Sequence, residues 1–225
     1  MQLTQLHDDV WTATAPQTMF GLHLGTRMTV VRLPSHGLWI HSPIALDEAG
    51  HDTLRAIGPV EHVVAPNLYH HLYVGAMAQE HAGVVVHARP RLRKKRPDLT
   101  ITANLEEAAP IAWGGVFKPV HIGGTLLDEV VFLHQPSRIL ISCDLVENFT
   151  SCSHALTRMY LQLGGIYQKP GIARPLRLVF RDRARARAAI DRLLGFQFDD
   201  LILSHGDIIR EGARDIIADT YHWLE

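Results

Sequence analysis

The sequence contains little of what would mark a secreted or membrane protein. Its 225 residues include two cysteines, Cys143 and Cys152, and a chain of this length buries enough core to need no disulfide framework. We therefore expect structural thiols and a reducing, cytoplasmic environment. No run approaches the ~18 to 20 consecutive apolar residues of a membrane-spanning helix. The stretch from Met1 to Asp9 lacks the basic start and apolar run of a secretory signal, so we expect no membrane partner.

The sequence also lacks an excess of charge of either sign. Its 22 Lys and Arg residues against 23 Asp and Glu residues give a formal net charge of -1, so no overall field attracts a polyanion. We therefore expect no nucleic-acid partner. One dense basic run, Arg89 to Arg96, is predicted to be an exposed loop, because it has no interleaved aromatic residues. The 15 histidines are notable, since imidazole is the commonest metal ligand.

Hydrophobic periodicity predicts an α/β chain. The opening half shows strands at 27–33 and 38–41 joined by a turn, a helix at 47–57, a strand at 60–65, a helix ending near 81 and a strand at 84–87. The closing half shows strands at 116–120, 129–133 and 139–143, helices at 155–163 and 182–194, a strand at 200–204 and a helix over 208–224. Because each half runs from strands to helices, we predict one αββα sandwich domain spanning residues 1–225.

Polar residues follow four of the predicted strands, where functional groups of α/β folds usually gather. The sequence has neither a Gly-x-Ser-x-Gly elbow nor a phosphate-binding Gly-rich loop, which excludes serine hydrolases and P-loop proteins. The four places are His41-Ser42-Pro43, Asn67 to His71, Asp144, and Ser204-His205-Gly206-Asp207.

This order resembles the metallo-β-lactamase superfamily along nearly the whole chain. In that family a hairpin ends in an Asp-x-Gly turn, a strand leads into His-x-His-x-Asp-His, a later strand ends in Gly-Asp, and a final strand ends in Gly-His or His-Gly. The equivalents here are His41-Ser42-Pro43, Pro66 to His71, Cys143-Asp144 and Ser204 to Gly206. The resemblance implies a metallo-β-lactamase-like fold and hydrolysis by metal-activated water.

The main motif is rewritten, however. With Gly75 as its trailing glycine, both leading histidines are replaced, and a slip of one residue makes His70-His71 the Asp-His pair instead. In either register the half that holds the first metal is missing, which disfavours a two-metal site. In the first register Asn67 and Tyr69 replace the leading histidines, His71 the aspartate and Leu72 the last histidine.

The remaining residues suit a single divalent ion. Three protein ligands with imidazole or carboxylate donors, plus water, suffice for a catalytic site. The resemblance implies zinc, with iron or manganese as alternatives, and a small ester, lactone or phosphoester as substrate. The predicted ligands are His70, His71, Asp144 and His205, of which Asp144 and His205 are also the predicted catalytic residues. The residues predicted to orient them are His41, Asn67, Glu129 and Asp207.

Other interpretations stay open. The family's third histidine has no evident equivalent, and Glu129, His121 and His134 are its candidates. Asp144 also suits a turn cap, and the segment from His205 to Asp207 suits an ordinary turn into the last helix. We therefore keep two alternatives beside the hydrolase: a non-catalytic binding protein with a degenerate site and no metal, and an iron-binding redox relative.

Overall fold

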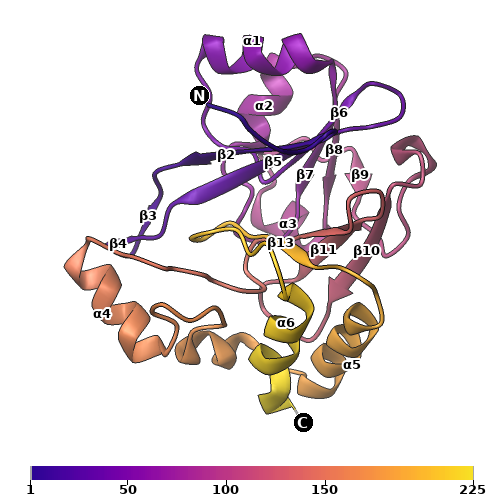
Figure 1. Cartoon of the computed structure of the whole chain (residues 1–225). Coiled ribbons are helices and arrows are strands. Elements are labelled where there is room, and N and C mark those ends of the chain that lie inside the picture. The colour runs from indigo at the N-terminus through magenta and orange to yellow at the C-terminus, as the bar shows by residue number, and fades with distance from the viewer. Residues whose placement is uncertain (1, 225) are drawn as a thin grey trace.

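In a computed structural model, which describes residues 2–224, the first half of the chain builds a sheet of seven strands (Figure 1). The strands β1, β2, β5 and β6 pair antiparallel, whereas β6, β7, β8 and β9 pair parallel. In sheet order they are β1 Thr4–His7, β2 Val10–Ala15, β5 Thr26–Arg32, β6 Leu38–His41, β7 Val60–Ala65, β8 Val85–Ala88 and β9 Ala103–Asn104.

The second half builds a sheet of four strands. Its first three strands pair antiparallel, as predicted, and the last two pair parallel. In sheet order they are β10 Phe117–Ile122, β11 Glu129–His134, β12 Ile139–Ile141 and β13 Asp200–Ile202. A separate small hairpin consists of β3 Thr18–Met19 and β4 Leu22–His23.

Helices cover the outer faces of both sheets (Figure 1). Helix α2 contacts β7 and β8, and α5 contacts β10 and α6. Among the described residues, no helix combines the length and the apolarity needed to cross a membrane. The helices are α1 Glu48–Ile57, α2 Val74–Glu80, α3 Pro90–Lys95, α4 Ala155–Gly164, α5 Arg183–Leu194 and α6 Ala213–Tyr221, with 3-10 turns at Ile111–Trp113, Arg174–Val179 and His222–Leu224.

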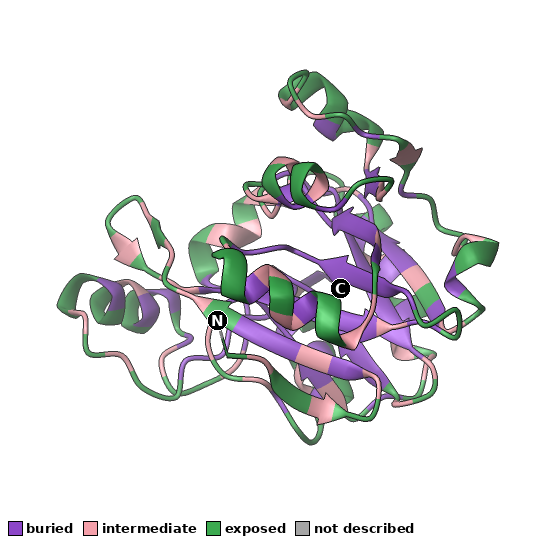
Figure 2. Cartoon of the chain, turned by 90° about the horizontal axis from the view of Figure 1, so that it is seen from above, coloured by how far each residue is buried: buried purple, intermediate pink, exposed green. Residues whose placement is uncertain are grey.

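Three apolar clusters fill the interfaces between these layers. The cluster between the two sheets is rich in aromatic rings, which supply large buried areas and edge-to-face contacts; it includes Trp39, Trp113, Phe117 and Phe132. A second cluster packs helical residues such as Leu54 and Met77 on the large sheet, and a third packs α5 and α6 on the small sheet. In Figure 2 the strands are mostly buried and the helices expose their outer faces. The predicted αββα sandwich is confirmed.

The structure corrects the prediction in two places. Residues 89–96 are not a loop but contain α3, because Pro90 stands at the first turn and Leu92 is fully buried. The last helix begins at Ala213 rather than near 208, because Ile209 pairs with Leu201 and Gly212 takes a left-handed conformation. The strands β1 and β2, for which no prediction was made, extend the large sheet.

Candidate metal centre

Two parallel strand pairs bring three of the four predicted ligands together. The carboxyl ends of neighbouring parallel strands lie at the same edge of a sheet, and the pairs here are β6 with β7 and β12 with β13. His70 follows β7, Asp144 follows β12 and His205 follows β13. One ligand atom from each of these three residues lies within 4.8 Å of the others. The cluster therefore takes one ligand from the large sheet and two from the small sheet.

Both imidazoles approach the same carboxylate oxygen. The Nε2 atom of His70 lies 3.3 Å from Oδ1 of Asp144, and Nε2 of His205 lies 3.2 Å from it. Ligand atoms placed about 2.0 to 2.1 Å from a tetrahedral zinc ion are roughly 3.3 Å apart. The three side chains are 9%, 14% and 8% exposed respectively, so the cluster is enclosed but not sealed from solvent.

The hydrogen bond of His205 to the backbone fixes which of its nitrogens carries a proton. Its Nδ1 lies 2.9 Å from the carbonyl oxygen of Gly25, and a carbonyl only accepts, so Nδ1 is protonated. In the neutral ring the lone pair of Nε2 then faces the carboxylate of Asp144. Two acceptors at this distance require a cation between them, either a proton on Nε2 or a metal ion. The donor set therefore fits a divalent cation.

The opposite charges of Asp144 and the two histidines stabilise one another and shift the pKa values of Asp144 and His205. Burial alone would raise the pKa of Asp144, but His70 and His205 hold it well below its usual range. Burial lowers the pKa of His205, but the hydrogen bond and charge of Asp144, with the charge of Glu147, outweigh it and raise that pKa above its ordinary value. A carboxylate that stays ionised beside two imidazoles attracts positive charge into the cluster.

Asn67 holds the carboxylate in place. Its Oδ1 accepts hydrogen bonds from the backbone N–H groups of Tyr69 and His70, both at 2.8 Å, so its amide nitrogen points the other way. That nitrogen donates to Oδ2 of Asp144 at 2.7 Å. In the sequence comparison Asn67 replaces a leading histidine of the motif, and here it supplies an amide donor to the carboxylate.

Glu129 fixes the loop that carries Asp144 by accepting hydrogen bonds from its backbone. Its carboxyl group is buried and accepts the backbone N–H groups of Cys143, at 2.6 Å, and Asp144. Burial and the charge of Asp144 raise the pKa of Glu129 to about 8. Of the three candidates for the missing histidine, Glu129 lies beside the cluster. His121 instead pairs with Asp128 at 2.7 Å, and His134 with Ser137 at 2.7 Å.

The structure does not bring His71 into the cluster. Its Nδ1 accepts a hydrogen bond from Arg96 at 3.0 Å. Burial lowers the pKa of His71 to about 4, and the charges of Lys95 and Arg96 contribute to this shift. The adjacent His70 turns the opposite way, and its Nδ1 lies 2.9 Å from the hydroxyl oxygen of Ser42.

The remaining predicted residues lie at different distances from the centre. His41 is buried, and burial followed by the charge of His70 lowers its pKa to about 3, so it is a neutral neighbour of the cluster. Its Nε2 has no hydrogen-bond partner among the described residues. Asp207 is exposed and accepts a hydrogen bond from the backbone N–H of Thr150 at 3.2 Å. It therefore stabilises a neighbouring turn rather than orienting a ligand.

Glu147 was not predicted and lies near the centre. It is buried, and within the described chain its Oε2 has no hydrogen-bond partner. Burial raises the pKa of Glu147 to about 7, while the charges of His205 and Asp144 act on it in opposite directions. The signal that could have identified it is an acidic residue inside the apolar stretch from Leu145 to Phe149, since an acid there needs a polar partner.

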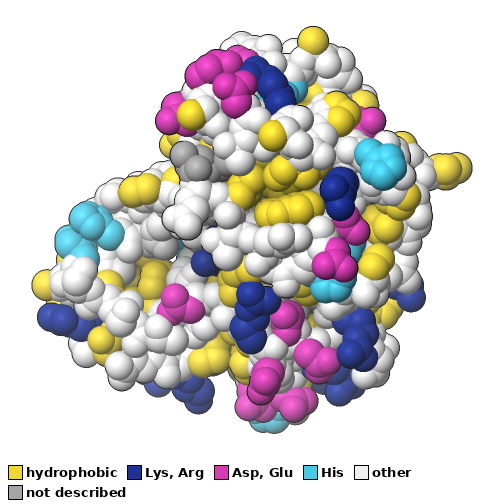
Figure 3. All heavy atoms as spheres, turned by 45° about the horizontal axis from the view of Figure 1, so that its top comes forward, with side chains coloured by type: hydrophobic (Ala, Val, Ile, Leu, Met, Phe, Trp, Pro, Cys, Tyr) yellow, Lys and Arg dark blue, Asp and Glu magenta, His cyan; other side chains and the backbone are white. Residues whose placement is uncertain are grey.

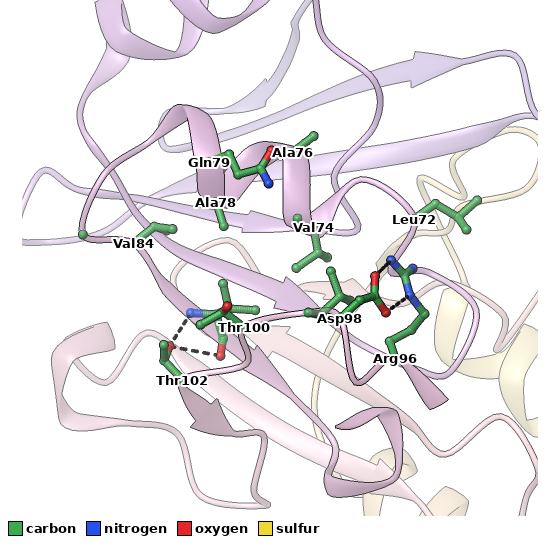
Figure 4. A pocket seen from close by; sticks show the side chains of 14 residues that line it. Leu72, Val74, Ala76, Ala78, Gln79, Val84, Arg96, Asp98, Thr100 and Thr102 are labelled. Atoms are coloured by element: carbon green, nitrogen blue, oxygen red, sulfur yellow. Dashed lines mark hydrogen bonds and ion pairs between the residues drawn. The ribbon is translucent and has the colours of Figure 1, made fainter. Parts of the chain in front are cut away.

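Two cavities lie on either side of Leu72. The one at the cluster has a volume of about 30 Å³ and reaches His70 and His205. The other, of about 480 Å³, lies between α2 and residues 96–102. Its charged residues Arg96 and Asp98 pair with each other at its rim (Figure 4). The titratable groups of the cluster thus converge at the smaller cavity.

Comparisons with known proteins identify the fold. A metallo-beta-lactamase from Pontibacter korlensis has 17% sequence identity and a TM-score of 0.69, covering 99% of this chain and 98% of its own. A metallo-beta-lactamase from Hirschia baltica has 15% identity and a TM-score of 0.65, covering 99% and 97%. The chain therefore has the metallo-β-lactamase fold, as the resemblance predicted. A family model described as "Domain of unknown function (DUF4336)" matches residues 7–92, and no curated protein matches the sequence.

Proposed function

We propose that this protein is a hydrolase of a small molecule that uses one divalent metal ion, held by His70, Asp144 and His205. The observation that carries the proposal is the contact of His205 with Asp144. The backbone carbonyl of Gly25 fixes the proton on Nδ1 of His205, which leaves Nε2 facing a carboxylate oxygen at 3.2 Å. The fold and the enclosed, solvent-accessible position of the cluster support a catalytic rather than a purely structural site.

The side chains would hold the metal ion, and the bound ion would supply the chemistry. A zinc ion bound there would polarise a carbonyl group and bring the pKa of water down to about 7. The two imidazoles and Asp144 supply the three protein ligands of a catalytic site. Asn67 fixes the second oxygen of Asp144, and Ser42 and Gly25 fix the two imidazole rings. Partners of this kind orient ligands and raise metal affinity.

Metal analysis of the purified protein tests the proposal. We expect close to one equivalent of zinc, manganese or iron per chain after purification without added metal. We expect His70→Ala and His205→Ala to lose most of it. His71→Ala is the matched control, because His71 is adjacent in sequence but bonded to Arg96, and it should keep its metal. Zinc added to protein from which the metal has been removed should raise the free energy of unfolding by about 2.7 kcal/mol at one hundred times Kd.

The same measurements separate the alternatives. A protein with far less than one equivalent of metal, no stabilisation by zinc, manganese or iron(II), and unchanged stability in His205→Ala would instead be a non-catalytic binding protein. The replacement of the leading histidine by Asn67 is the observation that favours that second function. Purified protein that contains zinc but no iron would count against an iron-dependent redox role.

A further inference from the structure

We propose that the substrate is an uncharged ester or lactone with a short apolar acyl group, and neither a phosphoester nor an ester with an anionic acyl group. This inference rests on the proposed hydrolase function and narrows its substrate class. It follows from the walls of the cavity that reaches His70 and His205.

The cavity walls are largely apolar and leave little room. Met19, Pro43, Leu72, Tyr69 and Tyr73 line it, and its volume is about 30 Å³. A single water needs about 10 to 15 Å³ of such volume. The cavity itself has room for about two or three waters, so a short acyl chain can contact this wall only at the cavity mouth, and a bulky group cannot enter.

Nothing on the wall balances a negative charge. Its polar side chains besides the two histidines are uncharged or aromatic, and the described residues that line the cavity include neither lysine nor arginine. The carboxyl groups near the histidines, those of Asp144, Glu129 and Glu147, cannot balance a negative charge either. A substrate carboxylate against this wall would therefore lose hydration without gaining a partner, which costs binding free energy.

The neighbouring basic side chains are already engaged. Lys95 donates to the carbonyl oxygen of Leu68, and its ammonium lies 4.3 Å from the ring centroid of Tyr69. Arg96 pairs with Asp98, as Figure 4 shows.

The buried Arg27 is engaged as well, since its guanidinium donates to the carbonyl oxygens of Leu203 and Gly206. On the face seen in Figure 3, basic and acidic side chains are interspersed rather than gathered into one positive field.

Phosphoryl transfer needs more positive charge than this site offers. Enzymes that transfer phosphoryl groups stabilise the equatorial oxygens with Arg, Lys or several metal ions. The three-ligand cluster would hold one ion, and the described cavity wall adds no cation. A neutral acyl ester needs only one polarised carbonyl oxygen, which matches what the site supplies.

Two esters that differ in one group test the inference. p-Nitrophenyl butyrate and p-nitrophenyl hemisuccinate share a leaving group, and a carboxylate in the second replaces the terminal methyl of the first. With zinc-loaded protein, and after subtracting the rate of His205→Ala, we expect kcat/KM for butyrate to exceed that for hemisuccinate by at least about tenfold, because the carboxylate is unpaired. p-Nitrophenyl phosphate should not be turned over above background.

A positive charge introduced at the rim should weaken this preference. Leu72 is 52% exposed, so Leu72→Lys adds a cation without disturbing the core. It should shift the butyrate to hemisuccinate ratio toward hemisuccinate by about fivefold or more. Leu72→Gln is the matched control, because it removes the apolar group without adding charge, and it should shift the ratio less than Leu72→Lys does.

Binding gives a readout that does not depend on activity. In protein without added metal, butyramide should shift the methyl NMR signal of Met19, and succinamate should shift it less at equal concentration. An equal or stronger response to succinamate overturns the inference. So does faster turnover of hemisuccinate or phosphate, which would leave the hydrolase proposal intact. If none of the esters is turned over above background, the hydrolase proposal is wrong and the inference falls with it.

Discussion

Replacing Asn67 by alanine removes four hydrogen bonds from the candidate metal centre. Two are accepted from the backbone N–H groups of Tyr69 and His70, one is donated to the carboxylate of Asp144, and a longer one, at 3.5 Å, is donated to Glu129. Neutral hydrogen bonds contribute about 1 kcal/mol each and bonds to charged groups about 1.5 to 3 kcal/mol. Because water can solvate the freed N–H groups in part, we expect the free energy of unfolding to fall by about 3 kcal/mol.

Asn67→Asp distinguishes the donor from the acceptor role. The carboxylate still accepts the two backbone N–H groups, but it faces Asp144 Oδ2 where an amide donor stood at 2.7 Å. Two carboxylates this close repel each other, so metal-free Asn67→Asp should be destabilised at pH 8 and should recover as the pH falls and one carboxyl group binds a proton. Zinc should stabilise this variant more than the parent, since the added carboxylate can bind the ion.

Urea denaturation followed by circular dichroism measures both effects, with and without saturating zinc. Domains of this kind are stable by about 5 to 15 kcal/mol, so both variants should remain folded at zero urea. An Asn67→Ala variant within about 0.5 kcal/mol of the parent would refute the hydrogen-bond assignment, because that is the usual size of a surface substitution. An Asn67→Asp variant that gains no more from zinc than the parent would refute the placement of its side chain.

Further predictions concern the surrounding fold. Gly206→Ala should cost about 3 kcal/mol or more in thermal unfolding and lower metal content, because residue 206 has φ of 95° and an added Cβ would lie 1.9 Å from the carbonyl oxygen of Asn148; an unchanged melting temperature contradicts this. Burial followed by the charge of His62 lowers the pKa of His87 to about 4. The stability from neutral His87 is therefore present above pH ~6.5 and is lost as the pH falls toward 4, by at most about 1.4 kcal/mol per pH unit. His87→Leu should flatten the stability curve in that window, and curves parallel to the parent would show that His87 does not titrate as stated. Leu92→Ala should cost about 2 to 4 kcal/mol in urea denaturation if α3 is packed as described, whereas a solvated loop would tolerate it.

The sequence predicted best where the pattern is local. The strand from Val60 to Ala65 was predicted with its observed bounds, because an apolar β-branched run lies between Gly58 and Pro66. Helix α3 was missed because its basic residues resemble a solvated loop, and the burial of Leu92 depends on contacts that periodicity does not reveal. The hydrophobic pattern thus identified the layers but not every element at their edges.

For the candidate site too, the local sequence pattern predicts one part, and the other part depends on tertiary contacts. The structure brings together His70, Asp144 and His205, three side chains that follow predicted strands. The neighbouring His71 could not be distinguished from His70 by sequence, because the choice depends on the loop that Asn67 fixes and on the distant Arg96. Side-chain direction in such a loop is a tertiary property, and adjacent residues there often point to opposite sides.

The three candidate ligands come from both halves of the sandwich, so an ion bound to them would link the two halves. His70 and Asp144 are 74 residues apart in sequence, so the contact forms only after a long loop closes, and loop closure of this kind slows folding. The segment matched by the family model, residues 7–92, contains only the first ligand. A divalent ion would therefore bind the assembled sandwich and not its isolated first half. Because the ion would link the two sheets, its removal should increase hydrogen exchange of the backbone amides at the interface between them.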